Sequence, residues 1–103
     1  MDVDFRNNNL VELYETGRNK KYKLQPNILR KFFMRIQELE AAKDIHDLWK
    51  KPSLNFERLH GFKNRYSLRL QDKWRLEIEI EWENEEQTEG TVYIVELSSH
   101  YGR

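Results

Sequence analysis

The spacing of hydrophobic residues along the chain changes once, from the period of a helix to that of a half-buried strand. Between Pro26 and Ala42 the apolar residues recur at intervals of three or four positions, as on one face of a helix. From Phe56 onward they alternate with polar residues, as in strands with one buried face. This order predicts an α+β fold, with a short N-terminal strand and two helices packed on a mostly antiparallel sheet of four to five strands.

The N-terminal part of the chain predicts the strand and both helices. Val3–Phe5 is expected to be the strand, and Asn8 or Asn9 is expected to cap a helix that ends before Gly17. The second helix is expected over residues 26–42, with proline at its first position. Its apolar stripe is expected to be core without a chemical role and comprises Ile28, Leu29, Phe32, Phe33, Ile36 and Leu39.

The remainder of the chain predicts a series of strands. Asp44–Leu48 has the pattern of a capped single helical turn, and Pro52 then interrupts the chain. An acidic, polar segment, residues 84–90, is expected to connect the last two strands. The four strands expected after the break are Phe56–Leu59, Arg65–Leu70, Trp74–Trp82 and Thr91–Leu97.

The composition excludes several classes of protein. The chain has no cysteine, so it can form neither a disulfide framework nor a thiolate metal site. Its N-terminus lacks the basic and apolar regions of a signal peptide, and no apolar run reaches membrane-spanning length. No nucleotide-binding glycine loop or nucleophile elbow is present. These features predict a cytoplasmic protein that needs no cofactor and no metal.

The net charge of zero hides blocks of opposite sign. Residues 18–35 carry only basic charges, and residues 77–96 carry only acidic ones. Such a dipolar surface can present its basic part to phosphate even though the protein as a whole is neutral. The alternative is that both blocks are solvated faces that balance each other, and charge alone does not decide between them.

The register of the expected hairpin over residues 65–82 brings two arginines together. Pairing Leu70 with Trp74 keeps all apolar residues on one face and leaves residues 71–73 as a three-residue loop. Arg69 then lies opposite Arg75. Like charges that face each other directly destabilise a sheet, so this pair requires an explanation.

An uncompensated pair of arginines predicts an anion site, because guanidinium groups match the geometry of phosphate. The same register sets Ser67 opposite Glu77, and Arg65 opposite Glu79 as a favourable cross-strand ion pair. The alternative is that Asp72, Glu77 or an acid of another strand neutralises the arginine pair.

Histidine and tyrosine side chains lie beside strand ends of the same sheet. His60 follows the expected strand 56–59, and His100 and Tyr101 follow the last strand. Together with arginines, these residue types suit metal-free phosphodiester cleavage: one group takes the proton of the attacking 2′-hydroxyl, another protonates the leaving 5′-oxygen, and arginines stabilise the charge on phosphorus. The alternatives are a surface histidine and a frayed C-terminal tail.

The order of these segments resembles the HigB-type toxins of the RelE/ParE superfamily, the toxin halves of bacterial type II toxin–antitoxin pairs. The resemblance covers nearly the whole chain, so residues 1–103 are expected to form a single compact domain of this type. The segments that carry it are DFRNNNLVELYETGR (4–18), LEAAKDIHDL (39–48), RLHGFKNRYSLRLQDKWRLEI (58–78) and VYIVELSSHYG (92–102).

The resemblance implies a ribosome-dependent mRNA endonuclease, an mRNA interferase that enters the ribosomal A site and inhibits translation. It also implies a HigA-like helix-turn-helix antitoxin, through which alone the toxin would meet operator DNA. By position, it assigns catalytic roles to His60, Arg75, His100 and Tyr101. The candidate RNA- and phosphate-binding residues are Lys63, Arg65, Arg69 and Lys73.

The chain departs from the family pattern in two places. Ser99 stands where many relatives have an acidic residue, before a His-Tyr pair that is reversed in order, and the basic connection after His60 is shortened. Which of His60, His100 and Tyr101 is the general base therefore stays open. Two other readings also remain: a ParE-like toxin that poisons DNA gyrase, and an inactive paralogue that still binds its antitoxin.

Overall fold

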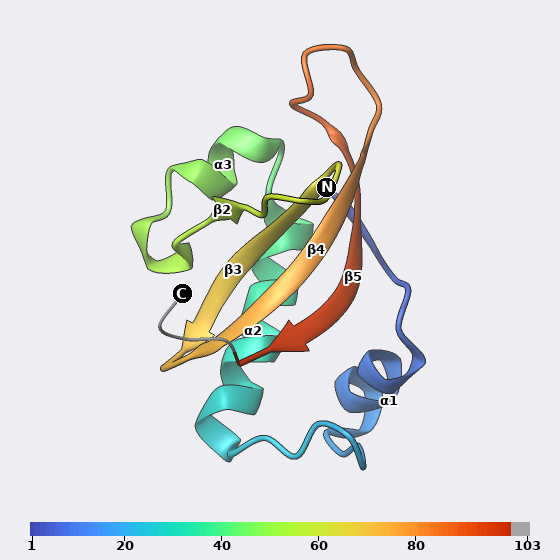
Figure 1. Ribbon diagram of the computed structural model, residues 1–103, viewed down its shortest axis with the longest axis vertical. Coiled ribbons are helices and arrows are strands. Elements are labelled where there is room, and N and C mark those ends of the chain that lie inside the picture. The colour runs from blue at the N-terminus through green and yellow to red at the C-terminus, as the bar shows by residue number, and fades with distance from the viewer. Residues whose placement is uncertain (100–103) are drawn as a thin grey trace.

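The computed structural model, which describes residues 1–99, has a five-stranded sheet in the order β1-β5-β4-β3-β2 with helices on one side (Figure 1). The α+β prediction is confirmed. The sheet is mixed because β1 runs parallel to β5 while the other neighbours are antiparallel. Within the described residues, no helix has the length and apolar character needed to cross a membrane. The elements are β1 (Asp2–Phe5), α1 (Asn8–Thr16), α2 (Pro26–Ala41), α3 (Ile45–Trp49), the 3-10 helix η1 (Pro52–Leu54), β2 (Glu57–Arg58), β3 (Arg65–Gln71), β4 (Trp74–Trp82) and β5 (Gly90–Ser98).

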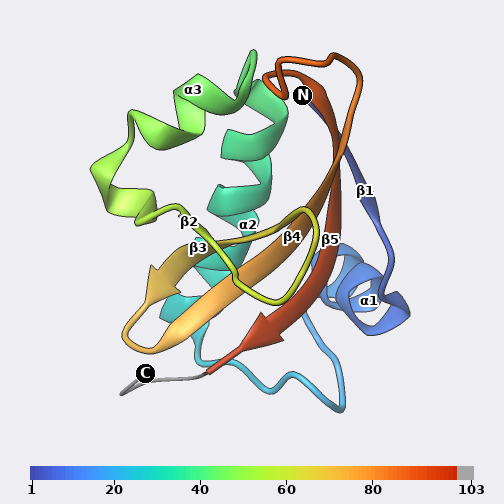
Figure 2. The ribbon, with the colours of Figure 1, turned by 45° about the horizontal axis from the view of Figure 1, so that its top comes forward.

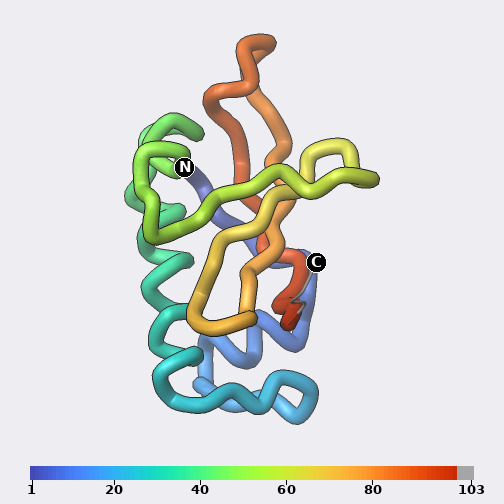
Figure 3. The backbone as a smooth tube through the Cα atoms, turned by 60° about the vertical axis from the view of Figure 1, so that its left-hand side comes forward, coloured from blue at the N-terminus to red at the C-terminus, as the bar shows by residue number. Residues whose placement is uncertain are grey.

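Helix α2 covers one face of the sheet and leaves the other face open. Figure 2 shows α2 behind the strands β3 to β5, with α1 beside the edge formed by β1. Four residues of the predicted α2 stripe are buried and the other two are partly buried against the same core, as expected. Figure 3 shows the turn between β2 and β3 extending to the side of the sheet that α2 does not cover. We call that side the open face.

The β3–β4 hairpin confirms the predicted facing of the arginines and corrects the predicted loop. Arg69 pairs with Arg75, but Gln71 rather than Leu70 pairs with Trp74, and the register shifts between residues 69 and 71. A β-bulge therefore takes up one residue, and the loop shortens to residues 72–73. The first loop residue, an aspartate, has a φ of 56°, the left-handed conformation that tight hairpin turns need.

The cap of α1 also differs from the prediction. Asn7, not Asn8 or Asn9, is the N-cap: its Oδ1 accepts hydrogen bonds from the backbone N–H groups of Asn9 (3.0 Å) and Leu10 (3.3 Å). Its Nδ2 also donates to the carbonyl of Val95 on β5, at 3.0 Å. One side chain thus starts the helix and joins it to the sheet, a long-range contact that the three consecutive asparagines do not reveal.

We expect Asn7→Ala to lower the free energy of unfolding by about 1–2 kcal/mol, because it removes the helix cap and the bond to β5. Asn8→Ala is the matched control, since Asn8 is exposed and does not cap the helix; it should change stability by less than about 0.5 kcal/mol. Urea denaturation followed by circular dichroism measures both. Equal losses in the two variants would contradict the assignment of the cap.

Candidate functional site

Arg75 is held in place on the open face by contacts from two other segments. Its Nε donates to Ser67 Oγ at 2.8 Å, and its Nη2 donates to the carbonyls of Asn55 at 2.6 Å and Ser67 at 3.3 Å. The Glu57 carboxylate lies 3.9 Å from Nη2 but is 52% exposed, so it screens the charge only weakly. No hydrogen bond within residues 1–99 uses Nη1 of Arg75, which leaves that group available to an anion.

The side chain of Arg75 is cationic but partly desolvated. Its side chain is only 19% exposed, and burial is the main cause that lowers its pKa; the carboxylate of Glu57 acts in the opposite direction. Arg69 lowers this pKa further, because a second positive charge lies across the strand pair. An arginine nevertheless remains protonated at neutral pH. The position therefore presents a fixed positive charge in a partly dry setting, where it interacts strongly with an anion.

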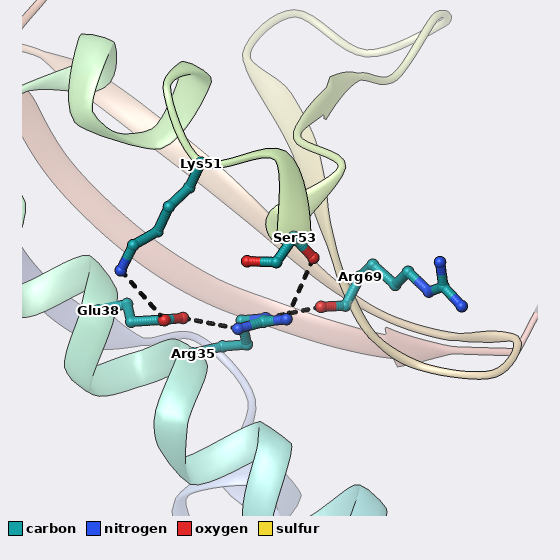
Figure 4. A network of polar contacts seen from close by, with 5 residues as sticks. All are labelled: Arg35, Glu38, Lys51, Ser53 and Arg69. Carbon is teal, nitrogen blue, oxygen red and sulfur yellow. Dashed lines mark hydrogen bonds and ion pairs between the residues drawn. The ribbon is translucent and has the colours of Figure 1, made fainter.

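Arg69 is the exposed member of the arginine pair. Among residues 1–99 its guanidinium has no hydrogen bond or ion pair, and in Figure 4 it points away from the neighbouring polar network. That network instead fixes the backbone of Arg69: the buried Arg35 of α2 donates from Nε to the Arg69 carbonyl at 2.7 Å and from Nη2 to the Ser53 carbonyl at 3.2 Å. Glu38 completes the network by accepting from Arg35 and from Lys51.

An acid of another strand partly neutralises the arginine pair: Glu57 of β2 lies 3.9 Å from Arg75 Nη2, whereas neither Asp72 nor Glu77 forms an ion pair with Arg69 or Arg75. Glu77 is buried and forms its ion pair with Arg65 at 3.4 Å, while Asp72 forms no ion pair within residues 1–99. Arg65 also pairs with Glu79 at 3.3 Å, which confirms the predicted cross-strand ion pair. The charge of Arg65 is therefore matched by two carboxylates, whereas the pair at Arg69 and Arg75 keeps excess positive charge.

His60 and Lys63 lie in the turn between β2 and β3, and both are exposed. Strand β2 ends at Arg58, earlier than predicted, so His60 belongs to the turn and not to a strand end. It lies three residues beyond Glu57, roughly 10 Å along an extended chain. No hydrogen bond or ion pair joins His60 to Arg75, so the structure does not bring these two predicted site residues into contact.

Of the remaining predicted catalytic and lysine residues, the structure describes Lys73 alone. Lys73 is exposed in the two-residue loop between β3 and β4. His100 and Tyr101 lie outside the described residues. Ser98, the strand partner of Arg75, precedes them by two and three positions in the sequence.

Sequence reasoning missed the residues that position the arginine pair. Ser67 could have been found, because the predicted register already set it diagonal to Arg75 on the same face, within reach of a long side chain. Arg35 also carried a signal, since it lies between the core positions Phe32 and Leu39 on the buried stripe of a helix. Asn55 carried none: its carbonyl reaches the Arg75 side chain only because of how the chain runs from η1 into the edge strand β2.

The family model of the RelE-like toxin of the type II toxin–antitoxin system HigB matches residues 3–94. No curated protein matches the chain. The matched region begins within β1, contains β2 to β4 and the arginine pair, and ends within β5.

Proposed function

The chain belongs to the RelE-like HigB toxins of type II toxin–antitoxin systems, and on that premise we propose that it is an endoribonuclease that cuts messenger RNA on the ribosome. The family implies an antitoxin partner. We propose that this antitoxin is a HigA-like helix-turn-helix protein, that operator DNA is met only through it, and that residues 1–103 act as one cytoplasmic toxin domain. The observation that carries the proposal is the anchored Arg75 opposite Arg69, whose guanidinium has no ion pair or hydrogen bond among residues 1–99.

The proposed reaction is metal-independent transesterification. The 2′-oxygen of a ribose attacks the adjacent phosphorus, the bond from phosphorus to the 5′-oxygen breaks, and a 2′,3′-cyclic phosphate and a 5′-hydroxyl result. Negative charge grows on the non-bridging oxygens as the attack proceeds, and Arg75 and Arg69 stabilise it. Arg75 suits this role because Ser67 and Asn55 fix it before substrate binds, so little reorganisation is needed during the reaction.

The two proton transfers need a base for the 2′-hydroxyl and an acid for the 5′-oxygen. His60, His100 and Tyr101 are the proposed candidates. Lys63 and Lys73 are proposed to contact phosphates on either side of the scissile one, since both are exposed cations at the two ends of β3.

A translation assay tests this function. Purified chain is incubated with ribosomes and a defined messenger, and the cut sites are mapped by primer extension; the same mixture without ribosomes is the control. We expect cuts within the reading frame only when ribosomes are present. If the chain arrested growth while the messenger stayed intact and chromosomal DNA was broken, the result would indicate gyrase poisoning and contradict the proposed function. Neither cuts nor growth arrest from the folded chain would indicate an inactive paralogue.

A further inference from the structure

A hollow of about 240 Å³ lies on the open face, away from the arginine pair. It is bounded by the turn between β2 and β3 on one side and by β4 and β5 on the other. Glu79 and Glu81 are four and six residues beyond Arg75 on β4, which corresponds to roughly 13 to 20 Å along the strand. The proposed reaction at Arg75 therefore does not use this hollow. The lining residues that matter here are Arg6, Phe62, Lys63, Glu79, Glu81 and Tyr93.

Two aromatic rings line the hollow, and each has an arginine stacked on it. The Cζ atom of Arg65 lies 4.3 Å from the centre of the Phe62 ring, and the Cζ atom of Arg6 lies 3.7 Å from the centre of the Tyr93 ring. Phe62 nevertheless remains 48% exposed. Aromatic rings and guanidinium planes are the surfaces on which proteins stack unpaired RNA bases.

The turn that carries Phe62 is fixed to the sheet. The carbonyl of Asn64 accepts from the backbone N–H of Ile80 at 3.0 Å, and its side-chain oxygen accepts from Trp82 Nε1 at 3.3 Å. Gly61 has a φ of 89°, a conformation that lets the chain reverse just before Phe62. Because the turn is already ordered, less conformational entropy is lost when a ligand stacks on the ring.

The two carboxylates of the hollow differ in their hydrogen-bond and ion-pair partners. Glu79 is engaged by Arg6 at 2.8 Å and by Arg65 at 3.3 Å. Among the described residues, the Glu81 carboxylate accepts a side-chain hydrogen bond only from the Tyr93 hydroxyl, at 3.3 Å, and Glu81 is exposed to solvent. A carboxylate with a free oxygen accepts well from an exocyclic amino group such as N4 of cytosine. Lys63, exposed beside it, can neutralise a phosphate of the same strand.

We propose that this hollow binds one nucleobase of the RNA, stacked on Phe62, with its exocyclic amino group donating to Glu81. The proposal rests on the proposed function, because it takes the ligand to be RNA. It adds a base-reading subsite separate from the cleavage site. Cytosine, adenine and guanine carry an exocyclic amino group and uracil does not, so the subsite should disfavour uracil at its position in the messenger.

The test measures binding of short single-stranded RNA, which does not require cleavage. Fluorescence anisotropy with labelled oligo(C), oligo(A) and oligo(U) gives the affinity of wild-type protein and of Phe62→Leu and Phe62→Tyr. Leucine keeps an apolar side chain but removes the ring, so we expect about fivefold to a hundredfold weaker binding, whereas tyrosine should retain it. Circular dichroism confirms that each variant is folded.

A second pair of variants tests the carboxylate. We expect Glu81→Gln to lose the preference for oligo(C) and oligo(A) over oligo(U), and Glu83→Gln, the same change at an exposed position outside the hollow, to keep it. These effects on binding would support the subsite even if the chain cut no messenger. Cleavage on the ribosome together with wild-type affinities in Phe62→Leu and Glu81→Gln would overturn the subsite and leave the nuclease intact. The subsite would also be overturned if these two variants bound RNA normally but bound a protein antitoxin more weakly, because the hollow would then be a protein-binding surface.

Discussion

Arg75→Ala is expected to reduce ribosome-dependent cleavage about a thousandfold while leaving the fold intact. The guanidinium of Arg75 lies on the open face, so its removal opens no large cavity in the core. It should, however, remove the fixed charge that stabilises the oxygens of the phosphorane, and single groups of this kind are worth about that much in rate. Primer-extension time courses with the purified variant measure the loss directly, and circular dichroism confirms the fold.

Three further substitutions test whether Arg75 acts through its fixed position and not only through its positive charge. Arg75→Lys keeps a cation but carries all its donors on one nitrogen, which cannot occupy the places of Nε, Nη2 and Nη1 at once, so it should remain severely impaired. Arg69→Ala should lose less, because that side chain is exposed and acts mainly through binding. Arg30→Ala, on an exposed position of α2 away from the open face, should cleave like wild type. Wild-type toxicity from Arg75→Ala at equal expression would remove Arg75 from the site.

The sheet register could be predicted because only one face of the hairpin is buried. A shift of one residue would have exposed Leu68, Leu76 and Ile78, each of which is fully buried, so the hydrophobic pattern permits a single facing of β3 and β4. The opposition of Arg69 and Arg75 follows from that facing. The loop was mispredicted because a two-residue turn with a bulge and a three-residue turn satisfy the same pattern.

The pairing of charged side chains on the open face could not be predicted from the sequence. Which carboxylates reach which arginines depends on side-chain paths across three strands. Glu77 and Glu79 both pair with Arg65, so the described residues leave only the exposed Glu57 as an ion-pair partner for the arginine pair. Phe62 gave no signal either, because a single aromatic residue in a short polar turn is common. Its importance appears only when the turn is seen to place it beside Tyr93 of the last strand.

Arg35→Met is expected to lower the free energy of unfolding by about 3 kcal/mol, although methionine fits the apolar surroundings. Arg35 has only 4% of its side chain exposed, and its loss leaves the carbonyls of Arg69 and Ser53 without their donors. Glu38 keeps only Lys51 as a partner. Urea denaturation measures the change, and Arg30→Met on the exposed side of the same helix should stay within about 0.5 kcal/mol of wild type.

The same substitution should impair cleavage even where the protein remains folded. Arg35 joins α2 to the end of β3 and to η1, and η1 leads directly to Asn55, which anchors Arg75. Loosening that end of β3 should let the arginine pair move, and a shift of about 1 Å in a positioning group can cost a hundredfold in rate. A fully folded Arg35→Met protein that cleaves at the wild-type rate would show that Ser67 and Asn55 hold Arg75 without support from α2. If Arg35→Met cleaved slowly but bound oligo(C) with wild-type affinity, the defect would be limited to Arg69 and Arg75 and would not extend to the hollow at Phe62.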